Sequence, residues 1–498
     1  MSAGDNSGPA ARRRAVASGR ESARPEATGG GATPPETAAR ESTSPAKPPT
    51  GAGRLWRRAD EAAGGLAADL VLYALSTAFA AVTAATSTLL PHRAWGSVAA
   101  VGYLVATVAV LGQLLVRRRR PDSPLAGVTG RAVLVALTWA GTALLPLVWQ
   151  AVERAGGRLD RAQEEVVVVE HAGARLLEHG TPYLGRDAIA ALPVDERLLG
   201  YTPYQPGMAI FGLPRAVAGD AWWTDARVWF AVGTAAALVG AVLLLRRPPR
   251  STAPEPSVAL PAGALVRAVQ LATVLPVCAL TLATGGDDLP VLALCLLALA
   301  CAARDRYLGA GLAVGLAAAL KLFAWPVMLV LLVHAVVRSR PQPGRPARWS
   351  VGPQFAVAAL GLPVLALVPA QLVDSAALVE NVLRFPLGDG LVTSPAQSPF
   401  PGYLIAQALP GGRGIATALL VGAGLLIAVV LVRRPPRTAA SVALFCGYGL
   451  LTAILLMPAT RFGYLLYPVA FLAWAPALRT PDPRPTSGTA ATALATAS

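Results

Sequence analysis

The sequence is poor in the side chains that carry much of the chemistry of soluble enzymes. Its 498 residues include four cysteines and four histidines, and only 14% of all residues are charged. The cysteines show neither paired spacing nor nearby histidines, which argues against a disulfide framework or a zinc site and favours plain helix packing. All four fall in apolar segments: Cys278, Cys295, Cys301 and Cys446. Lysine is scarcer still. The sequence contains only two, Lys47 in its N-terminal region and Lys321 in an apolar run.

Apolar residues predominate instead. They make up 54% of the chain, and the mean hydropathy is +0.51, which is more apolar length than a soluble core needs and indicates an integral membrane protein. The net charge of +15 does not point to nucleic acid, because the basic residues form short clusters between apolar runs. Such clusters are typical of cytoplasmic loops. They include RRRR at 117–120 and RRPPR at 246–250 and 433–437.

The two ends of the chain differ from the rest. Residues 1–53 are rich in Ala, Pro, Gly, Ser, Thr and Arg without apolar periodicity, which predicts a disordered cytoplasmic tail. Arg12 to Arg14 resemble a twin-arginine signal, but no hydrophobic stretch follows at the expected distance, so we expect no cleaved export signal. Residues 478–498 predict a second disordered tail.

Apolar runs of about 20 residues are long enough to cross a bilayer. Together with a helical hairpin at 307–337, these runs predict an all-α, multi-pass protein of the plasma membrane. It would have about twelve crossings and both termini cytoplasmic. Residues 54–130 would hold two additional N-terminal helices, and 131–477 a transmembrane core. The expected spans are 67–90, 97–116, 131–152, 226–245, 264–284, 287–303, 353–373, 413–432, 438–457 and 462–477.

The apolar segment 307–337 does not have the length of a single crossing. As one helix it would be roughly 46 Å long, too long for one crossing and short for two. Arginines lie on both sides of it, at 304–306 and 338–348, and both clusters should be cytoplasmic. We therefore predict a hairpin that turns back near Lys321, with Gly311 and Gly315 allowing its arms to pack closely.

This topology places most of the remaining polar groups on the outer face. They are the loops 153–204 and 374–402, the Gly285–Asp288 turn, the Lys321 apex and Arg461. Ionisable groups in or beside membrane helices are energetically expensive and usually mark a substrate path. The sequence thus predicts one polar site on the extracytoplasmic side.

The first outer loop predicts an amphipathic helix on the membrane surface. Val169, Ala172 and Leu176 recur at helical spacing, and acidic residues near 164–170 would sit where the helix dipole favours them. Helix capping and a catalytic role both remain open for these acids. The next stretch, 201–219, contains three prolines and predicts a short re-entrant element rather than a straight span. Tyr201 and Tyr204 at its entry can be interfacial anchors or ligands.

Three motifs in this order resemble the GT-C integral-membrane glycosyltransferases, specifically the polyprenyl-phosphate-sugar-dependent family 87, which includes actinobacterial mannosyltransferases. They are "AGARLLEHGTPY" at 172–183, "YTPYQP" at 201–206 and "GLAAALK" at 315–321. The resemblance covers about residues 131–477. It implies transfer of a hexose, expected to be mannose, from a polyprenyl phosphate sugar to an extracytoplasmic lipid or glycan.

The resemblance also implies a catalytic carboxylate seven residues before Ala172. Relatives carry aspartate there, whereas this chain has Glu165, with Glu164 beside it. Transfer further needs a cation to stabilise the departing lipid phosphate, for which Lys321 and Arg461 are the candidates; simple charge neutralisation of Lys321 remains open. The full set expected to bind substrate is Glu170, His171, Tyr183, Tyr201, Tyr204, Asp287, Asp288, Lys321 and Arg461.

No metal site is evident in the sequence, although acids in the outer loops leave a divalent ion possible. The alternatives to a transferase are a transporter or flippase of lipid-linked sugar and a non-catalytic membrane protein. The first is disfavoured because no internal repeat is found and the polar groups collect on one face.

Overall fold

The computed structural model describes residues 62–247, 262–340 and 350–479, and its regular elements there are all helices. By its contacts the chain divides into Met1–Ala52 and Gly53–Ser498, and every described residue belongs to the second unit. The all-α prediction is confirmed for these residues. The tail predicted at 1–53, and residues 480–498 of the C-terminal tail, lie outside them.

Seven helices in the described ranges are long and apolar enough to cross a membrane. The bent pair α11 (Ala262–Thr273) and α12 (Pro276–Thr284), with 44° between its halves, would make an eighth span. The seven are α2 (Leu66–Thr86, preceded by η1, Ala62–Gly65), α3 (Leu90–Arg119), the continuous α4–η3–α5 (Val128–Trp139, Ala140–Leu144, Leu145–Ala155), α10 (Ala226–Arg246), α16 (Val351–Val373), α20 (Gly412–Arg433) and α21 (Ala439–Leu456).

Four shorter apolar helices complete the bundle: α13 (Asp288–Ala303), α14 (Tyr307–Leu320), α15 (Ala324–Ser339) and η8–α22 (Phe462–Leu465, Leu466–Trp474). α13 is buried along nearly its whole length and packs against α10, α14 and α21. Each predicted segment is helical, but 264–284 is divided into two helices, α11 and α12, bent by 44°. The total of twelve crossings and the orientation of the termini remain predictions.

The predicted hairpin at 307–337 is confirmed. α14 ends at Leu320, Lys321 adopts an extended backbone (φ −153°, ψ 144°), and α15 begins at Ala324. The expected role of the glycines was wrong in one respect, because they bring α14 against α16 instead of against the other arm. A Cβ on Gly315 would lie 2.8 Å from the carbonyl oxygens of Ala358 and Ala359.

Prolines explain two π-helical turns. η3 is followed by Pro146 and η7 (Glu380–Arg384) by Pro386, and each proline lacks the N–H that would continue a regular α-helix. In the first case the residue four positions before the proline is Thr142. Its carbonyl oxygen accepts a hydrogen bond from the indole of Trp95 on α3 at 2.8 Å.

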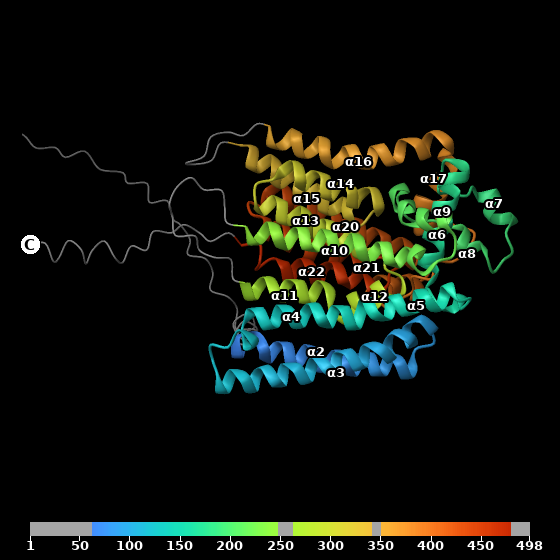
Figure 1. The fold of residues 1–498 in the computed structure, drawn as a ribbon. Coiled ribbons are helices and arrows are strands. Elements are labelled where there is room, and N and C mark those ends of the chain that lie inside the picture. Colours follow the sequence, from blue (N-terminus) through green and yellow to red (C-terminus); the bar gives the residue numbers. More distant parts are fainter. Residues whose placement is uncertain (1–61, 248–261, 341–349, 480–498) are drawn as a thin grey trace, which may run out of the picture. The chain divides into compact units, whose positions relative to one another are not determined.

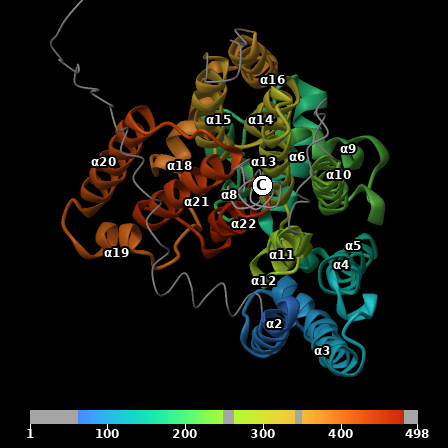
Figure 2. The same ribbon diagram turned by 90° about the vertical axis from the view of Figure 1, so that its left-hand side faces the viewer.

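The N-terminal helices α2 and α3 pack on this core beside α4 and α11 (Figure 2). The buried carboxylate of Asp69 on α2 contacts Arg131 on α4 and Arg267 on α11, each at 2.6 Å. The Tyr103 hydroxyl of α3 donates to the carbonyl oxygen of Val274, at the break between α11 and α12, at 2.5 Å. The additional helices are thus tied to the core by polar contacts as well as apolar packing.

The connecting loops contain short helices, several of which gather at one end of the bundle: α6, α7, α8, α9 and α17 (Figure 1). The helix predicted in the first outer loop is confirmed as α6, and the proline-rich stretch forms short helices as expected. These elements are η2 (Pro124–Ala126), η4 (Leu159–Arg161), α6 (Glu164–His179), α7 (Arg186–Ala191), α8 (Arg197–Gly200), η5 (Pro206–Gly212), α9 (Leu213–Ala218), η6 (Trp222–Thr224), α17 (Ser375–Val379), α18 (Phe385–Leu387) and α19 (Pro401–Ala408).

Candidate active site

The turn between α12 and α13 is held by side chains and backbone from other elements. The N–H of Gln163 donates to the carbonyl oxygen of Thr284 at 3.1 Å, and Arg227 donates to that of Ala283 at 3.2 Å. Gly286 has φ +87°, and a Cβ there would lie 2.7 Å from the ring of Phe230, so glycine is required on both counts. Asp287 and Asp288 follow this fixed turn directly.

Lys321 meets both aspartates. Its ammonium lies 2.7 Å from Asp287 and 2.6 Å from Asp288, and the side chains of all three are less than 10% exposed. The lysine comes from the bend of the α14–α15 hairpin and the acids from the α12–α13 turn, so two chain reversals bring them together. With both carboxylates ionised, the two acids and the ammonium carry a net charge of −1. We call these three residues the Lys321 centre.

Tyrosines surround the Lys321 centre. Tyr467 donates to the Asp288 carboxylate at 2.8 Å, and the rings of Tyr204 and Tyr464 have their centroids 5.3 and 5.6 Å from the ammonium. These are cation–π distances, and aromatic faces stabilise a desolvated cation. Phe323 stacks on Tyr467 at 5.2 Å. Buried charge is therefore balanced by ionic, hydrogen-bonding and aromatic partners together.

A second ion pair lies next to this centre. Glu165, in the first turn of α6, contacts the guanidinium of Arg461, and the side chains are 15% and 32% exposed respectively. A Cβ on Gly285 would lie 3.9 Å from a carboxylate oxygen of Glu165, which places that acid against the turn that carries Asp287. Arg461 also acts electrostatically on Tyr464, as Lys321 does. The structure therefore brings Glu165, Asp287, Asp288, Lys321 and Arg461 into one neighbourhood. Glu164 is exposed.

Glu170 belongs to a different cluster. Its carboxylate binds Arg154 at 2.6 Å and Arg215 at 3.2 Å, and it accepts from the N–H of Ala226. Arg154 also binds Asp225 at 3.0 Å. This buried network fastens α6 to α5, α9 and α10, and each of its two carboxylates is bound by arginine side chains of the protein. His171, on the same helix, is exposed. Neither residue lies among the contacts of the Lys321 centre.

Tyr183 and Tyr201 connect the segments 153–204 and 374–402 to the site. Tyr183 donates to the carbonyl oxygen of Tyr204 at 2.8 Å. Tyr201 stacks on Phe385 at 4.2 Å and donates to the buried carboxylate of Glu380 at 2.9 Å. Burial raises the pKa of the Tyr201 hydroxyl, so it remains a neutral donor. The two tyrosines thus support the segment that presents Tyr204.

Sequence reasoning missed several residues that matter here. Tyr464 and Tyr467 were included only as part of an apolar segment, although tyrosines three residues apart on one helix face are a recognisable signal. Glu380, in the segment 374–402, has no sequence signal that distinguishes it from a solvated surface charge, yet it is 2% exposed and binds Arg186 at 2.9 Å. Arg175 was not singled out. It contacts carbonyl and hydroxyl oxygens of residues 199–202, and burial lowers its pKa to about 10.

Within the part of the chain that the structure describes, no group of three or more His, Cys, Asp or Glu side chains is arranged to hold a metal ion. The carboxylates of the Lys321 centre are occupied by the lysine and by Tyr467.

The profile of glycosyltransferase family 87 matches residues 201–458, which is just over half of the chain. The chain belongs to glycosyltransferase family 87. No curated protein matches it. The family match includes the Lys321 centre and Tyr204 but excludes Glu165 and Arg461, so those two are assigned to the site by geometry alone. Membership in the family and the apolar helices together make this chain a membrane glycosyltransferase.

Proposed function

We propose that this protein transfers a hexose, in the first instance mannose, from a polyprenyl phosphate sugar to a lipid or glycan acceptor on the extracytoplasmic side of the plasma membrane. The observation that carries the proposal is the placement of the Lys321 centre beside the Glu165–Arg461 pair. An acid that is partly exposed, a buried anionic cluster and two cations are what this reaction requires of a protein.

Glu165 is the proposed general base. Its carboxylate is 15% exposed, so an acceptor hydroxyl can reach it, whereas Asp287 and Asp288 are enclosed by Lys321 and tyrosines. Pairing with Arg461 favours the ionised form that accepts a proton. Proton transfer to a positioned base contributes about 10²–10⁴-fold in rate. Glutamate in place of aspartate adds one methylene of reach.

The two cations have distinct proposed roles. Arg461 is 32% exposed and keeps part of its guanidinium available to a lipid phosphate. Lys321 has three N–H donors, two of which are directed to Asp287 and Asp288. On this proposal the third N–H donates to the departing phosphate, where a fixed donor stabilises the developing charge.

The net negative charge of the Lys321 centre can stabilise the sugar ring, which becomes positively charged in the transition state. Glycosyl transfer passes through a state with positive charge on the sugar ring. A buried cluster of charge −1 next to that ring favours it electrostatically, more strongly than the same cluster would in water. We propose that Asp287 and Asp288 supply this field instead of taking the acceptor proton.

The test compares Glu165→Gln with Glu164→Gln, an exposed neighbour that serves as a matched control. Membranes containing each variant at equal protein level are assayed for sugar transfer from labelled polyprenyl phosphate donor. We expect Glu165→Gln to lose about 10²-fold or more of the rate and Glu164→Gln to keep it. Equal loss in both would remove Glu165 from its proposed role.

The same assay separates the alternatives. Movement of labelled donor across the membrane without glycoside formation would identify a flippase. Absence of both activities in the unaltered protein, with donors of several sugars, would identify a non-catalytic member of the family.

A further inference from the structure

Gln163 lies directly before α6, two residues before Glu165. Residues at this position usually have short side chains, such as those of serine or aspartate, which accept a hydrogen bond from an N–H of the first helical turn. The side chain of Gln163 makes no such bond to α6. Its longer amide instead reaches the α12–α13 turn, which carries Asp287.

Two hydrogen bonds join Gln163 to Thr284, a fully buried residue. The backbone N–H of Gln163 donates to the carbonyl oxygen of Thr284 at 3.1 Å, and the Thr284 hydroxyl donates to the side-chain oxygen of Gln163 at 2.8 Å. The same oxygen would lie 3.0 Å from a Cβ on Gly285, the next residue of the turn. Because the two bonds use different atoms, they restrict the orientation of α6 against the turn as well as its distance.

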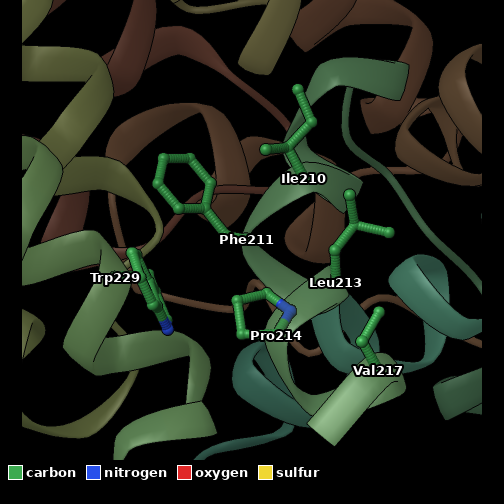
Figure 3. Close-up of a pocket in the computed structure, with 6 residues that line it drawn as sticks. All are labelled: Ile210, Phe211, Leu213, Pro214, Val217 and Trp229. Atoms are coloured by element: carbon green, nitrogen blue, oxygen red, sulfur yellow. The ribbon is translucent and has the colours of Figure 1, made fainter.

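The support of the turn at Gly286 is apolar. The Phe230 ring lies against Gly286, and Phe211 contacts Phe230 edge-on with ring centroids 5.0 Å apart. Phe211 also lines an apolar cavity of about 330 Å³ between the η5–α9 segment and α10 (Figure 3). Apolar contacts are not directional. The polar contacts that orient Glu165 against the turn therefore come from the other flank, where Gln163 lies.

His92 brings the N-terminal helix pair into the same contact. It is the third residue of α3, which begins at the end of the bundle where α6 lies (Figure 1). α3 also packs against η4, which ends two residues before Gln163. The imidazole of His92 hydrogen-bonds the side chain of Gln163. A side chain held by a second partner keeps one rotamer, so His92 holds the Gln163 amide toward Thr284.

We propose that Gln163 is a positioning residue for Glu165, and that His92 locks the Gln163 amide in the orientation that this role requires. The N-terminal helices, which lie outside the family match at 201–458, thereby contribute to the reaction without touching substrate. The inference rests on the proposed role of Glu165 as the general base. A misplacement of about 1 Å can cost about 10²-fold in rate, so loss of this support acts on the chemical step.

The first test measures kcat and KM for sugar transfer from labelled polyprenyl phosphate donor, with full-length variants in membranes. We expect His92→Phe to lower kcat about tenfold by misplacing the base, and to leave KM for the donor unchanged because Lys321 and Arg461 still hold the phosphate. His92→Gln and His92→Asn carry amides that reach where the two ring nitrogens lie, and at least one of them should restore most of kcat. His179→Phe, whose imidazole is 59% exposed at the end of α6, is the control and should keep the normal kcat.

A double variant separates positioning from simple packing. Gln163→Leu keeps much of the side-chain volume but removes the amide, and it should lower kcat at least as far as His92→Phe does. If His92 acts through Gln163, adding His92→Phe to Gln163→Leu causes no further loss, because residues that share one interaction are not additive. Additive losses would overturn the proposal. So would a normal kcat in His92→Phe, or a failure of both amide variants to restore it.

Hydrogen exchange distinguishes a failure of this inference from a failure of the proposed function. The amides at 163–166 include the N–H that bonds to Thr284, and their exchange should accelerate about tenfold or more in His92→Phe as this contact opens locally. Faster exchange with normal transfer in both His92→Phe and Glu165→Gln would trace the failure to the assigned base. Lost transfer in Glu165→Gln, with normal exchange and kcat in His92→Phe, would keep the transferase mechanism and reject the positioning role.

Discussion

The hydroxyl of Tyr103 lies 2.5 Å from the carbonyl oxygen of Val274, so a helix of the N-terminal pair contacts the break in the span that leads to the acidic turn. At this break the N–H of Cys278 bonds to Leu275 instead of to Val274, which leaves the Val274 oxygen to an outside donor. The N-terminal pair therefore stabilises an irregular backbone whose far end carries Asp287.

Removing that donor should destabilise the protein. We expect Tyr103→Phe to lower the free energy of unfolding by about 1–3 kcal/mol, because a buried carbonyl loses its partner, and to lower the thermal midpoint in detergent accordingly. Tyr448→Phe, at a 62% exposed position on α21, is the control and should leave the midpoint in place. Equal midpoints for Tyr103→Phe and the unaltered protein would show that another group, such as water, satisfies Val274.

Asp69 is expected to be the main polar anchor of the same helix pair. It is the carboxylate shared by Arg131 and Arg267, so Asp69→Asn leaves the buried guanidinium of Arg131 and the partly buried one of Arg267 with a neutral partner. Breaking a buried pair costs about 3–5 kcal/mol. Limited proteolysis should then cleave between α3 and α4 faster than in the unaltered protein. Asp122→Asn, exposed in that same connection, tests whether local charge alone explains faster cleavage.

The contribution of Lys321 to stability and its contribution to sugar transfer can be distinguished by combining substitutions. Lys321→Met leaves two buried carboxylates facing each other, and we expect a loss of about 3–5 kcal/mol of stability. Combining it with Asp287→Asn and Asp288→Asn should recover most of that loss without restoring sugar transfer. If the triple variant transfers sugar at the normal rate, the Lys321 centre is structural.

Glu380 joins the segments 153–204 and 374–402 through Tyr201 and Arg186. In Glu380→Gln the charge-assisted bonds, worth about 1.5–3 kcal/mol each, become neutral ones. Hydrogen exchange of the amides at 198–204 and 375–391 should then accelerate by about tenfold or more. Asp389→Asn, which alters an exposed carboxylate in the same loop, should leave these rates unchanged. Exchange that speeds up in neither variant would contradict the role given to Glu380.

The sequence was sufficient to predict the hairpin and its apex, because arginines on both sides of 307–337 and the length of the run leave few alternatives. It also indicated that Lys321 needs an anionic partner, since an isolated charge in hydrocarbon is expensive. It did not indicate that Glu165 would meet Arg461, because ion pairs between distant segments leave no periodic signal. For the same reason the ion pairs of Glu170 with Arg154 and Arg215 could not be predicted from the sequence.

Other differences have equally specific causes. The glycines at 311 and 315 predicted close packing but not the partner, because small residues permit approach by any neighbouring helix. The burial of Glu380 could not be predicted, because its π-helical turn, which is caused by a proline six residues later, is not recognisable from composition.

The π turns fix the rotational phase of the helices that come after them. A π turn holds one residue more than the regular α-helix, and each residue turns the helix by about 100°. Deleting one residue from η3 would leave α5 helical but rotate Gln150 and Arg154 away from α12 and α6, which they contact now. In this protein the one additional residue of η3 therefore determines which face of α5 is turned toward α6 and α12.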